Sequence, residues 1–418
     1  MSSPFDEMAG LENIAPPPTT ALLLPGGGAR AAYQVGVLKG IAELMRTAQH
    51  HPFRVLCGTS AGALNAVALS TRADDFIGAV AWLEQLWLQL AADRVYRADM
   101  LGLMRNALRL VMSLFNTGIA VGKPVALLDN APLRQLLSEQ LDFEAIARHI
   151  HNGKLEAICV TAMNYSLGTS VSFFQGGPGN AGWQRWRRQG IGCPITLKHL
   201  MASTAIPTIF PPEQIGAHYF GDGALRQMNP ISPVLHLGAR RVFVIPANGH
   251  RKTYDKPIRK IQSPAFGQII GHLLNSAFID SLETDIEMLE RLNELVTRLS
   301  PEECSQLSRP LEPVDLFVIS PSVDIDTIAE LHARELPRAL RSFLRATGSS
   351  RYNGGVNIAS YLLFTRSYIE QLIELGYNDA MIQSSEILSF INFAGRWKSL
   401  KFSPNKNENS AVPTAGNP

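Results

Sequence analysis

The fold of this chain is decided by the stretch Arg54-Val55-Leu56-Cys57-Gly58-Thr59-Ser60-Ala61-Gly62. Residues 54–57 are typical of a short buried strand, and the apolar run 63–69 is typical of the start of a helix. A serine at the tight turn between them stands exposed above the sheet, at the positive end of the helix dipole. The flanking Gly58 and Gly62 remove Cβ atoms that would clash there. The G-x-S-x-G pattern therefore predicts a nucleophile, and a plain Gly-Ser turn is the alternative.

A glycine-rich loop precedes this turn by one strand and one helix. Residues 21–24 are a continuous apolar run typical of a buried parallel strand, and Pro25 ends it. Gly26-Gly27-Gly28-Ala29-Arg30 follows, and a helical pattern then occupies residues 33–44. The order strand, loop, helix, strand and serine turn is a βαβ unit. It predicts an α/β fold with a parallel sheet covered by helices.

The glycine loop has two interpretations. Residues 26–31 also match the G-x-G-x-x-A pattern of dinucleotide sites, which hold a pyrophosphate at the helix N-terminus. That site needs an acidic residue at the end of the second strand, but this strand runs through Cys57 and Gly58 into the serine. Alternatively, the backbone N–H groups of the loop hold the oxyanion of an acyl-transfer intermediate. Neighbouring parallel strands end at the same edge of a sheet, so we expect the loop and Ser60 to lie close together.

A third candidate is Asp222, which stands between two glycines at the end of the predicted strand 218–220. The alternative is a hairpin turn, because Asp-Gly is a common hairpin former. The residues that follow, Ala224-Leu225-Arg226-Gln227, do not resemble a returning strand. Asp222 is therefore a candidate for the chemistry of the same site.

The rest of the chain alternates between strands and helices. The pattern predicts strands at 155–162, 169–174, 241–245 and 315–319, and helices at 74–92, 127–137, 197–205, 231–237, 265–299 and through most of 325–393. These elements give four parts: a disordered segment 1–19, a catalytic α/β domain 20–325, a helical extension 326–400 packed on it, and a disordered tail 401–418.

Two stretches have competing interpretations. Residues 100–122 are strongly apolar, and a buried helix is favoured over a cap that contacts a membrane. Residues 183–188 combine three arginines with two tryptophans. Stacking on nucleic acid would use such side chains, but the cluster is short and isolated, so we expect a solvated loop.

Composition excludes several classes of protein. Lys plus Arg (38) nearly balances Asp plus Glu (36), so no global field attracts nucleic acid. The four cysteines have no paired spacing, which fits a reducing compartment, and residues 1–12 do not resemble a secretory signal. No stretch has the ~18 apolar residues of a membrane span. We therefore expect a cytoplasmic protein, with peripheral membrane contact and signal-free secretion both left open. The ten histidines show no H-E-x-x-H spacing, so no metal is expected.

Together, the motifs resemble those of the patatin-like phospholipases, a family of serine lipid acyl hydrolases. The family's glycine-rich loop, G-x-S-x-G turn and D-G-G or D-G-A motif correspond to residues 26–30, 58–62 and Asp222-Gly223-Ala224. The segment 202–212 resembles the one that precedes the family's aspartate, and the likeness covers about residues 20–247. One departure is Ala31, where the family usually has glycine. The loop should tolerate it if Ala31 is helical, but not if this position needs a positive φ.

The resemblance implies a three-layer α/β/α fold with a largely parallel central sheet and a helical C-terminal part. It also implies a catalytic dyad of Ser60 and Asp222, with no cofactor. Backbone N–H groups of Gly26, Gly27, Gly28, Ala29 and Arg30 would form the oxyanion hole, with the Arg30 side chain orienting the loop or adding positive field. Gly58, Gly62, Gly223 and Ala224 would support the motifs. The implied substrates are acyl esters of phospholipids or lysophospholipids.

Alternatives remain at this point. An ordinary α/β-hydrolase would complete a Ser-Asp-His triad with His236, His250, His272 or His332. That fold places its serine after several strands, whereas Ser60 follows only the second. An acyltransferase or thioesterase would use the same dyad, and a nucleotide-binding or scaffolding protein would have a dead site. The oligomeric state is not indicated by the sequence.

Overall fold

The computed structural model describes residues 19–46, 51–113, 115, 124–248, 281–306, 312–346 and 358–392. The sheet and its helices belong to one compact unit, Pro18–Ile391. The expected disordered segments 1–19 and 401–418 lie outside the described residues, apart from Thr19. The boundary expected between residues 325 and 326 stays a prediction.

The described residues form a ten-stranded mixed sheet in the order β10-β9-β1-β2-β3-β4-β6-β5, with β8 also paired to β3 and β7 paired to β8. The five strands from β10 to β3 are parallel, whereas β4 and β8 run antiparallel to β3. The bounds are β1 Thr20–Leu24, β2 Val55–Thr59, β3 Ala157–Asn164, β4 Thr169–Gly176, β5 Trp183–Arg185, β6 Arg188–Gly192, β7 Glu213–Ile215, β8 His218–Asp222, β9 Arg241–Val244 and β10 Asp315–Val318.

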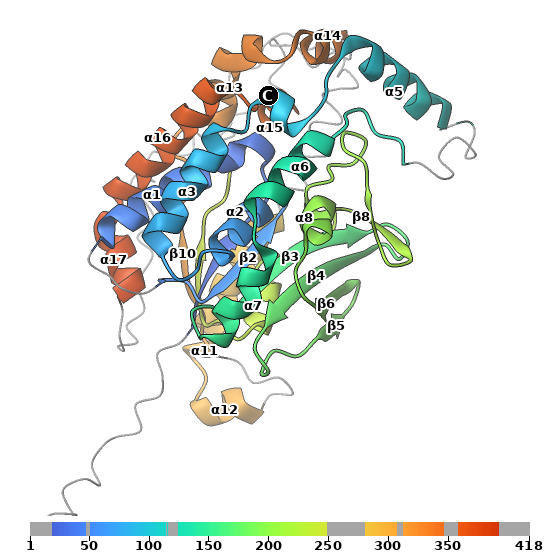
Figure 1. Ribbon diagram of the computed structural model, residues 1–418. Coiled ribbons are helices and arrows are strands. Elements are labelled where there is room, and N and C mark those ends of the chain that lie inside the picture. Colours follow the sequence, from blue (N-terminus) through green and yellow to red (C-terminus); the bar gives the residue numbers. More distant parts are fainter. Residues whose placement is uncertain are drawn as a thin grey trace, which may run out of the picture. The chain divides into compact units, whose positions relative to one another are not determined.

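Helices cover the sheet, as Figure 1 shows. Their bounds are α1 Ala32–Leu44, α2 Ala61–Ser70, α3 Phe76–Leu88, α4 Ala92–Val95, α5 Met100–Ser113, α6 Ala131–Gln140, α7 Phe143–His151, α8 Leu197–Ser203, α9 Ser232–His236, α11 Ser281–Val296, α12 Pro301–Gln306, α13 Ile325–His332, α14 Arg338–Ala346, α15 Ile358–Leu362, α16 Arg366–Ile382 and α17 Ser384–Asn392.

The two faces of the central sheet pack into separate hydrophobic cores because successive side chains of a strand point to opposite sides. In β1, Leu22 and Leu24 belong to the larger core with residues of α1, α2, α3 and α16. Ala21 and Leu23 belong to the smaller core with residues of α9 and α11. All four side chains are fully buried, at 1% exposure or less. The expected three-layer α/β/α fold with a largely parallel centre is confirmed.

The C-terminal helices pack directly on the first helix. A Cβ atom at Gly36 of α1 would lie 2.0 Å from the carbonyl oxygen of Ile373, and one at Gly376 of α16 would lie 2.2 Å from that of Tyr33. Glycine at these two positions lets α1 and α16 approach backbone to backbone. Figure 1 shows α16 lying alongside α1, although the two are more than 300 residues apart in sequence.

Two expectations from the sequence are wrong. Residues 183–188 do not form a solvated loop: they contribute β5 and the start of β6, joined by a turn at Arg187 with φ 52°. Trp183 of β5 stacks on Phe174 of β4. This contact gives the tryptophan a packing role within the sheet. Of the helix expected at 100–122, residues Met100–Ser113 are helical and Leu103 is the one buried residue among them, whereas residues 114 and 116–123 lie outside the described part of the chain. Of the expected helix 265–299, the part before residue 281 lies outside the described residues.

Candidate active site

Ser60 lies at a strained turn between β2 and α2. Its φ of 56° and ψ of −130° put a non-glycine residue in a sparsely populated region, which costs about 1–3 kcal/mol. A Cβ atom at Gly58 would lie 2.4 Å from the Gly62 carbonyl oxygen, and one at Gly62 would lie 2.0 Å from the Leu24 carbonyl oxygen. Both glycines of the motif are therefore required by close backbone contacts, as the sequence predicts.

The Ser60 hydroxyl donates a hydrogen bond of 2.5 Å to Oδ2 of Asp222. Asp222 ends β8, which pairs with β3 so that Asp222 lies opposite Ala162. Its other oxygen, Oδ1, accepts a 3.0 Å bond from the Ala224 N–H. The carboxylate is thus held by one contact to the chain and directed by the other at the serine.

Burial controls the charge of Asp222, whose side chain is 0% exposed. Loss of water raises the pKa of Asp222 from 3.8 to about 7, although the hydrogen bonds from Ser60 and the Ala224 N–H lower it. A carboxylate with a pKa near neutral pH is a stronger base than an ordinary aspartate, and it is still ionised in about half of the molecules at pH 7.

The glycine loop lies beside Ser60, since β1 and β2 are neighbouring parallel strands. Gly28 has φ +55°, and it begins a short 3-10 helix, Gly28–Ala31. Ala31 has φ −67°, so its Cβ atom fits and the departure from glycine does not disturb the loop. The N–H groups of Gly27 and Gly28 donate no hydrogen bond to any described residue. Within the described part of the chain, these two N–H groups are therefore available to a ligand.

Two further polar side chains hold the turn. Ser203 accepts a 2.8 Å hydrogen bond from the Ser60 N–H and donates one of 2.6 Å to the Thr161 carbonyl. Gln227 accepts from the Thr59 hydroxyl at 2.5 Å and donates to the Thr161 hydroxyl at 3.3 Å. The sequence pattern does not mark either residue as part of the site, although Ser203 lies in the family-like segment 202–212 and Gln227 follows the D-G-A motif.

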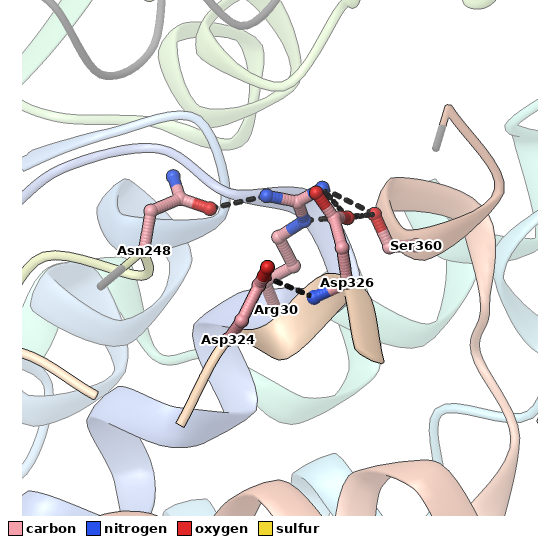
Figure 2. Close-up of polar contacts among 5 residues, drawn as sticks. All are labelled: Arg30, Asn248, Asp324, Asp326 and Ser360. Atoms are coloured by element: carbon pink, nitrogen blue, oxygen red, sulfur yellow. Dashed lines mark hydrogen bonds and ion pairs between the residues drawn. The ribbon is translucent and has the colours of Figure 1, made fainter. Parts of the chain in front are cut away.

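Arg30 ties the glycine loop to the C-terminal helices (Figure 2). Its guanidinium donates to Ser360 of α15 at 2.8 Å, pairs with Asp326 of α13 at 2.5 Å and donates to Asn248. It also lies 4.2 Å from the ring centroid of Tyr361. These contacts join the guanidinium to residues of α13, α15 and the chain after β9, and they support the prediction that Arg30 orients the loop. No sequence signal connects Arg30 with residues about 300 positions away.

Ser60 faces a small apolar cavity of about 30 Å³. It is lined by residues from the glycine loop, the serine turn and α2, the segment from α3 to α4, α6, the loop after α8 and the C-terminal segment: Gly28, Ser60, Ala61, Leu64, Trp87, Leu90, Val95, Leu133, Thr204, Ile206, Phe210, Tyr361 and Phe364. An apolar wall suits an acyl chain. A volume of this size holds little more than one water molecule, so the cavity must widen before an acyl chain enters.

Histidine does not complete a triad within the described residues. His236 stacks on Trp183 and contacts the Ser232 carbonyl, and His332 contacts Glu335 and Gln371. His250 and His272 lie outside the described part of the chain. In that part no cluster of His, Cys, Asp and Glu could hold a metal ion, and no helix is long and apolar enough to cross a membrane.

Comparisons with known proteins identify the family. A family model described as patatin-like phospholipase matches residues 22–235, just over half of the 418 residues. Among solved structures, VipD from Legionella pneumophila has 11% identity and a TM-score of 0.35, over 89% of this chain and 67% of that one. Human GIVD cytosolic phospholipase A2 has 11% identity and a TM-score of 0.42, over 90% of this chain and 60% of that one.

The chain therefore spans about 60–67% of the length of these two proteins. No curated protein matches it. The family model covers the glycine loop, the serine turn and the D-G-A motif, which are the parts of the chain assembled around Ser60. The chain belongs to the patatin-like phospholipase family of hydrolytic lipid enzymes.

Proposed function

We propose that this protein is a serine lipid acyl hydrolase that cleaves acyl esters of phospholipids or lysophospholipids with a Ser60-Asp222 dyad. The observation that carries the proposal is the 2.5 Å hydrogen bond from the Ser60 hydroxyl to Asp222, made at a strained turn beside the glycine loop. Supporting observations are the apolar cavity at Ser60 and the raised pKa of Asp222. Buried titratable groups with perturbed pKa values gather at catalytic sites.

In the acylation step, Ser60 Oγ attacks the ester carbonyl carbon while the Asp222 carboxylate accepts the hydroxyl proton. The carbonyl oxygen becomes an oxyanion, and the N–H groups of Gly27 and Gly28 donate hydrogen bonds to it. The intermediate then collapses: the bond to the leaving alcohol breaks, and Asp222 gives its proton to that alcohol. The acyl group remains on Ser60.

In the deacylation step, water attacks the acyl-serine while Asp222 accepts a proton from the water. The second intermediate collapses to a free fatty acid, and Asp222 returns the proton to Ser60 Oγ. No other base is needed, because the same carboxylate takes and gives one proton in each half of the reaction. Ser203 keeps the backbone of Ser60 in the strained geometry through both steps.

The test is the release of fatty acid from phosphatidylcholine and lysophosphatidylcholine in mixed micelles, followed by mass spectrometry. Ser60→Ala should lose activity at least about a hundredfold, because the nucleophile is gone. Ser70→Ala is the matched control: Ser70 is buried at the other end of α2, and among the described residues its hydroxyl bonds the Val67 carbonyl alone. His236→Ala and His332→Ala should retain most activity.

Three outcomes would contradict the proposal. Equal fatty-acid release by wild type and folded Ser60→Ala would show that Ser60 is not the nucleophile. A histidine variant as inactive as Asp222→Asn would point to a triad. An acylated alcohol or thiol, formed in place of free fatty acid once that acceptor is added, would make the enzyme an acyltransferase.

A further inference from the structure

Helix α5 presents an apolar face that no described element covers. Leu101 is 82% exposed, Leu108 is 61% exposed, and Phe115, just beyond the helix, is 87% exposed. Met100, Met104, Val111 and Met112 are exposed as well. Figure 1 shows α5 at the edge of the molecule, next to α14. Large contiguous apolar patches on a protein surface mark sites where another molecule or a membrane binds.

The surroundings of this face are basic. Helix α5 contains Arg105 and Arg109 and no acidic residue. Helix α14, which contacts α5, contains Arg338, Arg341 and Arg345 and again no acidic residue. Arg105, Arg338 and Arg345 are exposed, and none of the three pairs with a described carboxylate. The apolar face therefore stands beside arginines whose charge is available to an anionic partner.

Helix α11 offers a comparison within the same chain. It also exposes apolar side chains, including Met288 and Leu295 at 54% each. However, α11 carries five acidic residues and one arginine, so an anionic surface would repel it. The two helices share the apolar character and differ in the sign of their charge. An anionic bilayer should bind α5 and not α11.

The apolar face is connected to the cavity at Ser60. Asn106 of α5 donates a 3.2 Å hydrogen bond to the Leu127 carbonyl. The backbone N–H groups of Leu127 and Leu128 donate bonds of 2.8 Å to the carbonyls of Thr208 and Ile209. The same loop supplies Ile206 and Phe210 to the cavity wall. A bilayer that holds α5 therefore also holds the cavity wall close to lipid.

We propose that α5 and α14 form a membrane-docking surface for bilayers that contain anionic lipids. The apolar side chains of α5 insert among the acyl chains, and the arginines of α5 and α14 pair with lipid phosphates. If the proposed function holds, docking through this surface brings lipid substrate close to the wall of the cavity that must widen to admit an acyl chain. Docking itself does not depend on the role of Ser60.

Vesicle flotation of the Ser60→Ala protein separates docking from hydrolysis, because this background leaves the lipid intact. Vesicles of phosphatidylcholine with a quarter of phosphatidylglycerol should bind the protein, and pure phosphatidylcholine should bind it much less. Leu101→Glu/Leu108→Glu should lower the partition coefficient at least about a hundredfold, because each side chain contributes about tenfold or more on burial. The matched control Met288→Glu/Leu295→Glu on α11 should bind like the parent.

A charge variant keeps the proposal testable if the glutamate variant fails to fold. Arg105→Gln/Arg345→Gln should lower binding about 25-fold, since an arginine near an anionic surface contributes about fivefold. It should also weaken the dependence on salt. Absence of binding to anionic vesicles, or equal losses in the α11 control, would overturn the proposal. So would a wild-type dimer that the α5 variant converts to a monomer without any vesicle binding, since the face would then join two copies of this chain.

Discussion

Replacing Asp222 by asparagine should stabilise the fold while it removes activity. Asp222 is fully buried, and burial raises its pKa from 3.8 to about 7. Between these two pH values the native state keeps a proton that the unfolded chain has released. The free energy of unfolding of the wild type therefore falls as the pH rises through this window. A shift of about three pKa units corresponds to about 4 kcal/mol at pH 8.

Asparagine avoids this cost because it stays neutral at every pH. Its amide keeps both contacts of Asp222, since it can donate to the Ser60 hydroxyl and accept from the Ala224 N–H. The free energy of unfolding of Asp222→Asn should therefore exceed that of the wild type at pH 8 by about 4 kcal/mol. The difference should shrink by about 1.4 kcal/mol for each pH unit below 7.

Urea unfolding monitored by circular dichroism, from pH 5 to pH 8.5, measures this difference. Asp93→Asn is the control, because Asp93 is exposed and its replacement should change the free energy of unfolding by less than about 0.5 kcal/mol. A difference between Asp222→Asn and wild type that does not vary with pH would refute the reasoning. So would an Asp222→Asn protein that is less stable than the wild type at pH 8.

Three more predictions concern the same site. First, kcat/KM for a soluble ester should rise about tenfold per pH unit up to about pH 7 and then level off, because only ionised Asp222 accepts the proton; a flat profile from pH 5 to 8 would argue against this base. Second, Gly28→Ala should lose about a hundredfold or more in kcat, because its Cβ atom would lie 2.4 Å from a backbone oxygen and would displace the loop that binds the oxyanion. The control Gly153→Ala, with φ +66° but open space around its Cβ atom, should keep full activity. Equal activities of the two variants would show that the glycine loop does not bind the oxyanion. Third, Arg30→Met should lower the free energy of unfolding by about 3–5 kcal/mol, because it removes the ion pair with Asp326, whose side chain is only 13% exposed, and adding Asp326→Asn should restore part of the loss; strictly additive losses in chemical denaturation would contradict this pairing.

Short-range patterns predicted the elements of the site well. The strands at 21–24 and 54–57 and the turn at Ser60 follow from apolar runs and glycine spacing, which depend on neighbouring residues alone. The meeting of the glycine loop with Ser60 follows from the shared edge of parallel strands. The glycines around Asp222 and the end of its strand made it a candidate, but its pairing with Ser60 depended on the family resemblance, because nothing local shows that β8 returns to β3.

Features that depend on distant residues were not predictable. Arg30 meets Asp326 and Ser360 only because α13 and α15 fold back onto the loop. The apolar pattern of residues 100–122 predicted the helix α5 correctly, but such a pattern does not reveal whether the chain supplies a partner for its apolar side chains. For this reason the favoured interpretation, a buried helix, was wrong. The strands at 183–188 were missed because their arginines outweighed the stacking of Trp183 on Phe174.

The central claim is that Ser60, activated by Asp222, is the covalent nucleophile. Labelling with an alkyl fluorophosphonate, read by intact-mass spectrometry and peptide mapping, tests this claim most directly. The account predicts one adduct per chain, located on Ser60, with slower labelling of Asp222→Asn and none of Ser60→Ala. An adduct on another residue, or unchanged labelling of Ser60→Ala, would contradict it.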